Sequence, residues 1–200
     1  MTRPNIIKII CHDIGKHLGC YGIKSLNTNS IDSLAKEGIL FNNAFATSPG
    51  CSPSRAAIAT GRYPHNTGVL GLAHAHFGWS LDKKIKHIAR YFSSNDYNSI
   101  LFGLQHVTYH EETLGFKKIF PERPADHVIK NIEDNIDTIL FKKPFYAEVN
   151  FFEPHRPFDF DGVKSYRSKG VFIPKYIPNN SSIKKEFEAM QGAIKKMDES

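Results

Sequence analysis

Long apolar runs are scarce in this sequence of 200 residues. The first apolar stretch, from Ile6 to Cys11, contains Lys8 and is too short for the apolar part of a secretory signal. No other stretch approaches the roughly 20 apolar residues that a membrane-spanning helix requires. We therefore expect a chain with no membrane partner, and a cytoplasmic location for the sequence as written.

Cysteine is also rare, with residues only at positions 11, 20 and 51. A disulfide framework needs several paired cysteines, so an odd and small number argues against one. Cys11 is expected in the core, because it belongs to a predicted strand, and Cys20 is expected to pack within a loop.

The excess of positive charge is modest, with 26 Lys and Arg residues against 20 Asp and Glu residues. The basic residues form scattered short pairs, such as Lys83-Lys84, and do not alternate with aromatic residues. A basic stripe with aromatic residues is typical of nucleic-acid binding, so we expect no nucleic-acid partner. The mild positive balance would still attract an anionic substrate.

Segments with strand-like and helix-like patterns alternate along the chain. A buried strand is predicted at 5–11, and further strands at 39–45, 98–102 and 144–152. Helices are predicted at 29–37 with Asn29 as the cap, from Pro53 onward, and at 81–92, 125–140 and 183–197. Residues 154–182 read as a loop. This alternation predicts an α/β fold, a sheet covered by helices, and the length fits a single domain.

Polar residues follow two of the predicted strands. His12 and Asp13 come directly after the first strand, and the segment containing His155 follows the run that ends at Phe152. Functional residues of α/β sheets gather at the C-terminal ends of the strands. These positions are therefore candidates for a binding or catalytic site.

The segment Cys51-Ser52-Pro53-Ser54-Arg55 combines a nucleophile with a predicted helix start. Proline favours the first turn of a helix, so Cys51 is expected just before the helix N-terminus. Unpaired N–H groups and positive partial charge at that end suit an anion such as sulfate. Arg55, in the first turn, could orient the nucleophile or bind sulfate oxygens with its planar fork of donors.

This segment, with its continuation Ala56 to Pro64, resembles the active-site signature of the sulfatase family. Residues 5–22, 27–38 and 41–45, and the run from Pro144 to Arg156, are similar to further family segments. Within the family the heparan N-sulfatase (sulfamidase) branch looks most similar. The resemblance implies an alkaline-phosphatase-like fold, with a mixed, mostly parallel sheet and helices on both faces. It also implies that residues 1–200 are the N-terminal part of a sulfatase catalytic domain, incomplete at the C-terminus.

The family resemblance further implies a reaction. A formylglycine-generating enzyme would oxidise Cys51 to formylglycine, whose hydrated aldehyde attacks sulfur and later expels sulfate. A divalent metal, usually Ca²⁺ in the family, would assist. The implied substrate is a sulfate ester or sulfamate, of a small molecule or a saccharide.

The resemblance assigns roles to six residues, and two positions depart from the pattern. Asp13 and Cys51 match metal ligands, Cys51 and Arg55 match catalytic residues, and His106 and His155 match catalytic and substrate-binding histidines. His12 occupies the place of an acidic ligand, where it could bind the metal or contact substrate instead. Leu104 replaces a lysine expected to hold sulfate, which puts the usual sulfate geometry in doubt.

Three functions remain open at this stage. The first is sulfatase activity. The second is phosphonate or phosphate monoester hydrolysis within the same superfamily, and the third is a non-catalytic truncated remnant that binds anions. Because the resemblance predicts further metal ligands beyond Ser200, we expect the 200-residue chain alone to be inactive or very weakly active.

Overall fold

The computed structural model describes residues 3–137 and 144–200, and the chain divides into two compact units. Unit 1 comprises Met1–Ile10, Phe45–Arg123 and His127–Asn150. Unit 2 comprises Cys11–Ala44, Pro124–Asp126 and Phe151–Ser200. Each unit has apolar residues of its own in a buried cluster, around Val69 and Val107 in unit 1 and around Leu26 and Ile194 in unit 2.

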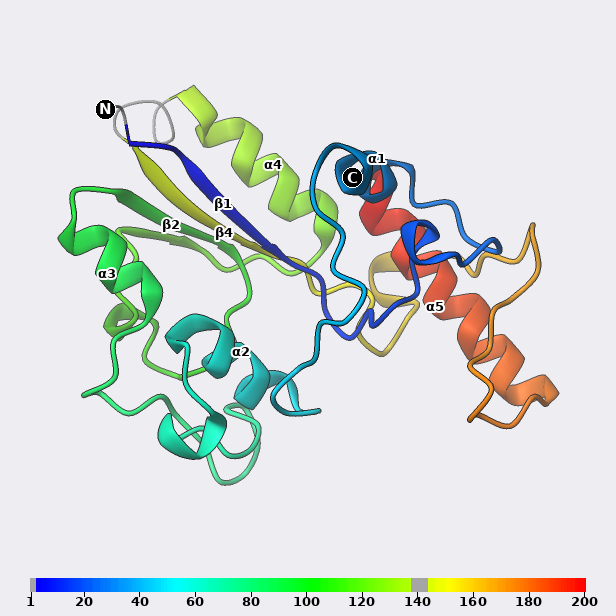
Figure 1. The fold of residues 1–200 in the computed structure, drawn as a ribbon, viewed down its shortest axis with the longest axis horizontal. Helices are drawn as coiled ribbons and strands as arrows, with labels where there is room; N and C mark the ends of the chain where they lie inside the picture. Colours follow the sequence, from blue (N-terminus) through cyan, green and yellow to red (C-terminus); the bar gives the residue numbers. More distant parts are fainter. Residues whose placement is uncertain (1–2, 138–143) are drawn as a thin grey trace. The chain divides into compact units, whose positions relative to one another are not determined.

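Unit 1 is built on a four-stranded sheet of β1 (Ile6–Ile10), β2 (Asn98–Gly103), β3 (Lys118–Phe120) and β4 (Phe145–Asn150). The strand order is β1-β4-β2-β3, and all three pairs are parallel. Every residue of β4 is buried because β4 lies between two neighbours (Figure 1). The prediction of a mostly parallel sheet is confirmed.

Strand β1 differs from the buried strand predicted for residues 5–11. It lies at the edge of the sheet, and Ile7 and Ile9 are 60% and 53% exposed. Lys8 points the other way, and its ammonium group lies 2.6 Å from Glu148 Oε2 on β4. The sequence alone gave no sign of this pairing, because the two residues are far apart in the chain.

The helices of unit 1 are α2 (Cys51–Thr60), α3 (Ile88–Ser94) and most of α4 (Ala125–Asn135). Figure 1 shows α3 and α4 on opposite sides of the sheet, which confirms the prediction of helices on both faces. The short 3-10 helices η2 (Pro64–Asn66) and η3 (Glu111–Thr113) complete this unit. The end predicted for α4, at Leu140, lies outside the described residues.

Two predicted elements of the chain are wrong. The helix expected from Leu81 begins only at Ile88, because Leu81 and Asp82 donate their backbone N–H groups to Val107 and Thr67. The strand expected at 39–45 is absent, and the carbonyls of Phe41 and Asn42 accept hydrogen bonds from side chains instead. Strand β3 was not predicted, because a strand of three residues is too short to show an alternation of apolar and polar side chains.

Unit 2 contains the helices α1 (Asn29–Glu37) and α5 (Ser181–Glu199) and the 3-10 helices η1 (Gly19–Tyr21) and η5 (Phe160–Gly162). Asn29 is not the cap of α1. The N–H groups of Ser30 and Ile31 are bound by the carboxylate of Asp198 on α5, at 3.1 and 2.9 Å. A carboxylate at a helix N-terminus is stabilising, and here it joins the two helices.

A buried amide fixes the loop of unit 2 on α5. Gln191 is fully buried, and its Nε2 donates to the carbonyls of Tyr166 and Gly170 at 3.0 and 3.1 Å. Its Oε1 accepts from Ser25 Oγ and from the backbone N–H of Phe172. The loop predicted at 154–182 is confirmed as far as Asn180, apart from η5, and Gln191 ties three of its residues to α5.

The cap of α5 gives a first prediction. Asn180 Oδ1 accepts a hydrogen bond from the backbone N–H of Ile183 at 3.0 Å. Replacing Asn180 with alanine is expected to lower the free energy of unfolding by about 1 kcal/mol. Urea denaturation would measure the change, and Asn179→Ala at the neighbouring exposed position is the control. Equal effects of the two substitutions would contradict the cap.

Candidate functional site

Cys51 is the first residue of α2, which begins two residues before the predicted start at Pro53. It is half-buried and has a free thiol. The first N–H groups of a helix have no partner within it, and Pro53 has no N–H group to offer. The donors of the first turn are therefore those of Cys51 and Ser52, and both point toward the end where an anion would bind.

Arg55 lies in the same helix and is 6% exposed. Its Nη1 donates to the backbone carbonyl of Leu104 at 3.4 Å, and Asn150 Nδ2 donates to the same oxygen at 2.7 Å. The side chain of Leu104 is buried, and its backbone carbonyl accepts the hydrogen bond from Arg55. A buried guanidinium next to the start of α2 adds positive charge where an anion would need it.

His106 follows β2 in a loop with an unusual backbone. Both Gly103 and His106 have positive φ values, +85° and +58°. Gln105 fixes the loop, because its Oε1 accepts from the N–H group of Val107 at 2.6 Å and its Nε2 donates to the carbonyl of Thr108 at 2.6 Å. These hydrogen bonds hold the backbone on the C-terminal side of His106.

Unit 1 brings two of the predicted residues together. A ring nitrogen of His106 and the Sγ of Cys51 lie within 4.8 Å of each other. The ring of the exposed His74 lies 4.7 Å from that of His106, between centroids. Cys51 and His106 therefore lie close together, and Arg55 reaches the backbone two residues before His106, at Leu104.

Unit 2 brings the other three predicted residues together. His12 Nδ1 lies 3.0 Å from Asp13 Oδ1, and His155 Nε2 lies 3.9 Å from Asp13 Oδ2. The rings of His12 and His155 meet edge to face, with 4.4 Å between their centroids. His12 is 2% exposed, whereas the side chain of Asp13 is 57% exposed. We call His12, Asp13 and His155 the histidine–aspartate cluster.

Glu153 supports this cluster from behind. Its backbone carbonyl accepts from the N–H group of His12 at 3.0 Å, and its Oε1 accepts from the N–H group of Ala125 at the start of α4. Burial raises the pKa of Glu153 above its ordinary value. Glu153 therefore positions His12 through the backbone.

The donors of the cluster do not fit calcium. Calcium prefers oxygen ligands, whereas two of the three donors of this cluster are imidazole nitrogens. Imidazole with carboxylate suits borderline ions such as zinc. The prediction of a divalent metal fits these residues, and the prediction of calcium does not.

A cavity of about 560 Å³ begins at Asp13 and continues along unit 2. Apolar and aromatic side chains form most of its wall, among them Tyr21, Phe172 and Phe187. The ring of His17 stacks on Phe187 with 5.5 Å between centroids, and burial lowers the pKa of His17. An aromatic wall beside a polar cluster is typical of a ligand site.

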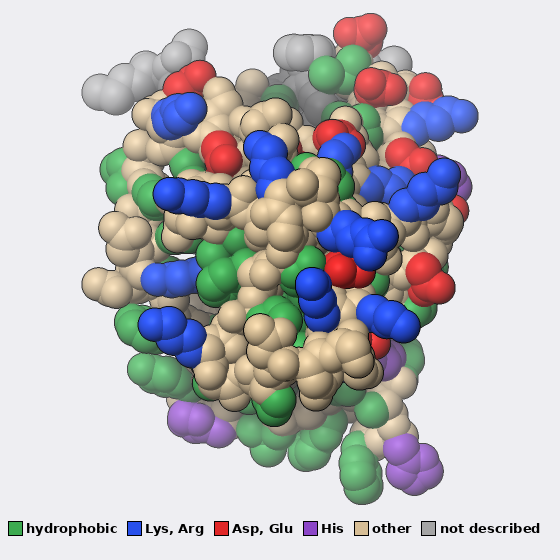
Figure 2. Space-filling model, turned by 90° about the vertical axis from the view of Figure 1, so that its right-hand side faces the viewer, with side chains coloured by type: hydrophobic (Ala, Val, Ile, Leu, Met, Phe, Trp, Pro, Cys, Tyr) green, Lys and Arg blue, Asp and Glu red, His purple; other side chains and the backbone are tan. Residues whose placement is uncertain are grey.

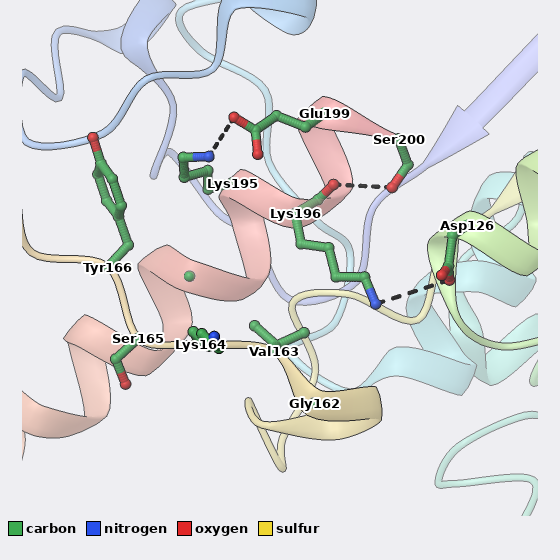
Figure 3. Close-up of a pocket in the computed structure, with 11 residues that line it drawn as sticks. Asp126, Gly162, Val163, Lys164, Ser165, Tyr166, Lys195, Lys196, Glu199 and Ser200 are labelled. Atoms are coloured by element: carbon green, nitrogen blue, oxygen red, sulfur yellow. Dashed lines mark hydrogen bonds and ion pairs between the residues drawn. The ribbon is translucent and has the colours of Figure 1, made fainter.

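A second cavity of unit 2, of about 610 Å³, lies beside α5 and is shown in Figure 3. Lys196 lies 2.9 Å from Asp161 Oδ2 and 3.9 Å from Asp126 Oδ1, and Lys195 pairs with Glu199. Carboxylates thus balance both ammonium groups, so we do not assign this cavity to sulfate. Figure 2 shows the same mixture on one face of the molecule, where Lys and Arg side chains lie among Asp and Glu side chains.

The sequence did not single out Asn150, Gln105 or Glu153, whose hydrogen bonds hold the backbone at Leu104, Val107 and His12. Each is a polar residue within a β-prone segment or next to one, and each is buried to 8% exposure or less. Polar residues at the C-terminal ends of buried strands were the only available signal.

Comparison with known proteins assigns the chain to a family. The sequence profile of the family named Sulfatase matches residues 4–197. The chain belongs to the sulfatase family. The uncharacterized sulfatase YidJ of Escherichia coli (strain K12) is 36% identical over 132 residues, which is 64% of this chain and 24% of YidJ. Human N-sulphoglucosamine sulphohydrolase is 25% identical over 232 residues, which covers 99% of this chain and 46% of that enzyme.

The fold of this sulfatase-family chain is shared with solved structures. The crystal structure of the phosphonate monoester hydrolase of Agrobacterium radiobacter matches with a TM-score of 0.76 at 18% identity, over 98% of this chain and 57% of that chain. The predicted family and its alkaline-phosphatase-like fold are confirmed. The chain spans less than half the length of the two curated relatives named above. Among the described residues, no helix is both long and apolar enough to cross a membrane.

Proposed function

We propose that residues 1–200 are the N-terminal part of a sulfatase catalytic domain that hydrolyses a sulfate ester or sulfamate of a sugar. The observation that carries this proposal is the position of Cys51, at the start of α2 and within 4.8 Å of a His106 ring nitrogen. The sugar is supported by the name of the human relative, which is a sulphoglucosamine sulphohydrolase.

The residues of unit 1 suit the steps that such a reaction needs. As formylglycine, residue 51 supplies a hydrated aldehyde whose oxygen attacks sulfur. The half-buried position of Cys51 fits this group, because the side chain is accessible and lies at a helix N-terminus. The N–H groups of the first turn and the Arg55 guanidinium would hold sulfate oxygens, and His106 would give a proton to the leaving oxygen.

The residues of unit 2 would bind substrate and a metal. Asp13 would be a metal ligand, with His12 at 3.0 Å on one side and His155 at 3.9 Å on the other, and these residues would hold the metal where it can bind the sulfate. The cavity that begins at Asp13 would receive the sugar, since aromatic rings such as Phe187 pack against the apolar face of a sugar ring.

Modification of Cys51 is the experiment that tests the proposal. We expect the chain, when expressed together with a formylglycine-generating enzyme, to carry an aldehyde at residue 51, measured by peptide mass spectrometry. Cys11 and Cys20 of the same chain are the internal controls and should remain thiols. An unmodified Cys51, under conditions that convert a known sulfatase, would favour the non-catalytic remnant.

Phosphonate or phosphate monoester hydrolysis is the second candidate. The shared fold of the phosphonate monoester hydrolase of Agrobacterium radiobacter supports it, whereas Leu104, which offers no cation where the resemblance predicts a lysine, favours the non-catalytic remnant. The ratio of kcat/KM for a 4-nitrophenyl sulfate to that for a phenyl phosphonate ester, measured on the modified protein, separates the two candidates. A ratio above one supports the sulfatase.

A further inference from the structure

We propose that the histidine–aspartate cluster of unit 2, His12, Asp13 and His155, is a binding site for zinc in preference to calcium. The inference concerns the identity of the ion and does not depend on the modification of Cys51. It rests on the donors of the cluster, on their spacing and on the tautomer of His155.

The spacing of the donors suits a small ion. Two ligands of a tetrahedral zinc, each about 2.0–2.2 Å from the metal, lie about 3.4 Å apart. The observed separations are 3.0 Å from His12 Nδ1 to Asp13 Oδ1 and 3.9 Å from His155 Nε2 to Asp13 Oδ2. All three ligand atoms lie within 4.8 Å of one another. Small side-chain movements would therefore complete the site.

Hydrogen bonding fixes the His155 ring in the form that binds metals. Its Nδ1 contacts the backbone carbonyl of Arg156, and a carbonyl can only accept, so Nδ1 carries the proton. In the neutral ring Nε2 then has a lone pair, and Nε2 is the atom that faces Asp13. A second nitrogen bonded to a carbonyl is the usual support of a metal-binding histidine.

The backbone holds the other two ligands in place. The N–H group of His12 donates to the carbonyl of Glu153, and Asp13 has a φ of +51°, which turns its side chain sharply after His12. His12 is buried against Phe152, with 6.2 Å between ring centroids, and has little freedom to lose on binding. Three protein ligands leave one position of a tetrahedral zinc for water or substrate.

The alternative is an imidazolium pair without a metal. A protonated His155 would place its Nε2–H toward the Asp13 carboxylate, and the pair would need no ion. Zinc binding instead replaces the protons on the ligand atoms, and these protons leave to solvent. The two states differ in whether the chain takes up one zinc ion.

Titration of the metal-free 200-residue chain with zinc chloride and with calcium chloride, by isothermal titration calorimetry, tests the proposal. We expect one zinc ion to bind at least about 100-fold more tightly than calcium. Calcium binding as tight as zinc binding, or no zinc binding at all, would overturn it. If zinc binds while Cys51 resists modification, the proposed function fails and this inference stands.

Variants locate the bound ion. His12→Ala and His155→Ala are each expected to weaken zinc binding by at least about 10-fold. His110→Ala is the matched control, because His110 Nδ1 lies 3.3 Å from Glu112 Oε1 in an exposed pair that lacks a third ligand among the described residues. Its zinc affinity should equal that of the unaltered chain.

Two further results keep the test decisive. If His12→Ala fails to fold, His155→Ala suffices, because the side chain of His155 is 32% exposed and its loss leaves the core intact. His12→Asp should move the preference toward calcium, since it replaces a nitrogen donor with oxygen. Zinc binding that is unchanged in His155→Ala would place the ion on other residues and refute the site.

Discussion

Replacing Gly103 with alanine is expected to lower the free energy of unfolding by more than about 3 kcal/mol. Gly103 is the last residue of β2 and has a φ of +85°, where an L side chain is strained. A Cβ atom there would lie 1.9 Å from the backbone oxygen of Asn150, its partner on β4. Backbone atoms cannot move aside as a flexible side chain can, so strands β2 and β4 would have to separate locally.

Gly61→Ala is the matched control for this substitution. Gly61 ends α2 with a φ of +66°, and a Cβ atom there would meet nothing within 4 Å. Gly61→Ala should therefore lower the free energy of unfolding only by the backbone strain, about 1 kcal/mol. Urea denaturation of both variants measures the difference. Equal costs would show that the contact with Asn150 is not what requires glycine at residue 103.

Gly103→Ala should also disturb the candidate site, through the backbone of the next residue, Leu104. Asn150 and Arg55 both donate to the carbonyl of Leu104, which directly follows Gly103. Displacing this strand end would move the acceptor that holds the Arg55 guanidinium. We therefore expect the Arg55 guanidinium to be displaced in the Gly103→Ala protein that remains folded.

Acidification is expected to destabilise the chain through His87. Burial lowers the pKa of His87 from 6.5 to about 4, with the nearby Glu148 acting in the opposite direction. Neutral His87 Nδ1 accepts a hydrogen bond from the N–H group of Ala89 at 3.1 Å and so caps α3. Protonation at Nδ1 would abolish this acceptor, so the folded chain favours neutral His87.

The sign of the pH effect follows from the direction of the shift. Above pH 6.5 His87 is neutral in both states, and its contribution to stability is fully present. Between pH 6.5 and about 4 the unfolded chain binds a proton that the folded chain does not, so stability falls as pH falls. The loss amounts to about 3 kcal/mol by pH 4.

Glu148 responds in a lower pH range. Burial alone would raise the pKa of Glu148, but the Lys8 ammonium at 2.6 Å holds it below its ordinary value of 4.5. Its stabilising contribution is therefore lost only as pH falls below 4.5, which leaves the range from 6.5 to 4.5 to His87 and His17, whose pKa values are both lowered by burial.

His87→Asn isolates the titration from the cap. Asparagine is a favoured N-cap residue, so it retains an acceptor for Ala89 and removes the ionisable group. Urea denaturation at pH 7.5 and pH 4 should show that the unaltered chain loses about 3 kcal/mol more than the variant. Parallel losses in the two proteins would assign the acid sensitivity to other groups.

Local sequence was sufficient for much of the fold and for half of the site. The boundaries of α1 and the presence of β1, β2, β4 and α5 follow from patterns within a few residues. Cys51 and Arg55 share one helix, so their relation was predicted from spacing. The helix from Leu81 and the strand at 39–45 were wrong, because hydrogen bonds with other parts of the chain outweighed local propensity.

The identity of the metal ion is a point at which the family resemblance and the structure differ. The resemblance implied calcium, and His12 already departed from the pattern by residue type. Only the folded unit 2 shows that His155 lies on the other side of Asp13, more than 140 positions away in the chain. That third donor makes a nitrogen-rich set, which calcium does not prefer.

By itself the sequence determined the family, the α/β class and the placement of a nucleophile at a helix start, because motifs and periodicity are local. Tertiary structure alone decided that Asp198 caps α1 and that Leu104 holds Arg55 by its carbonyl. It also decided that Gly103 must lack a side chain. These contacts join residues that are distant in sequence, and their energies depend on burial and close approach, which no short pattern records.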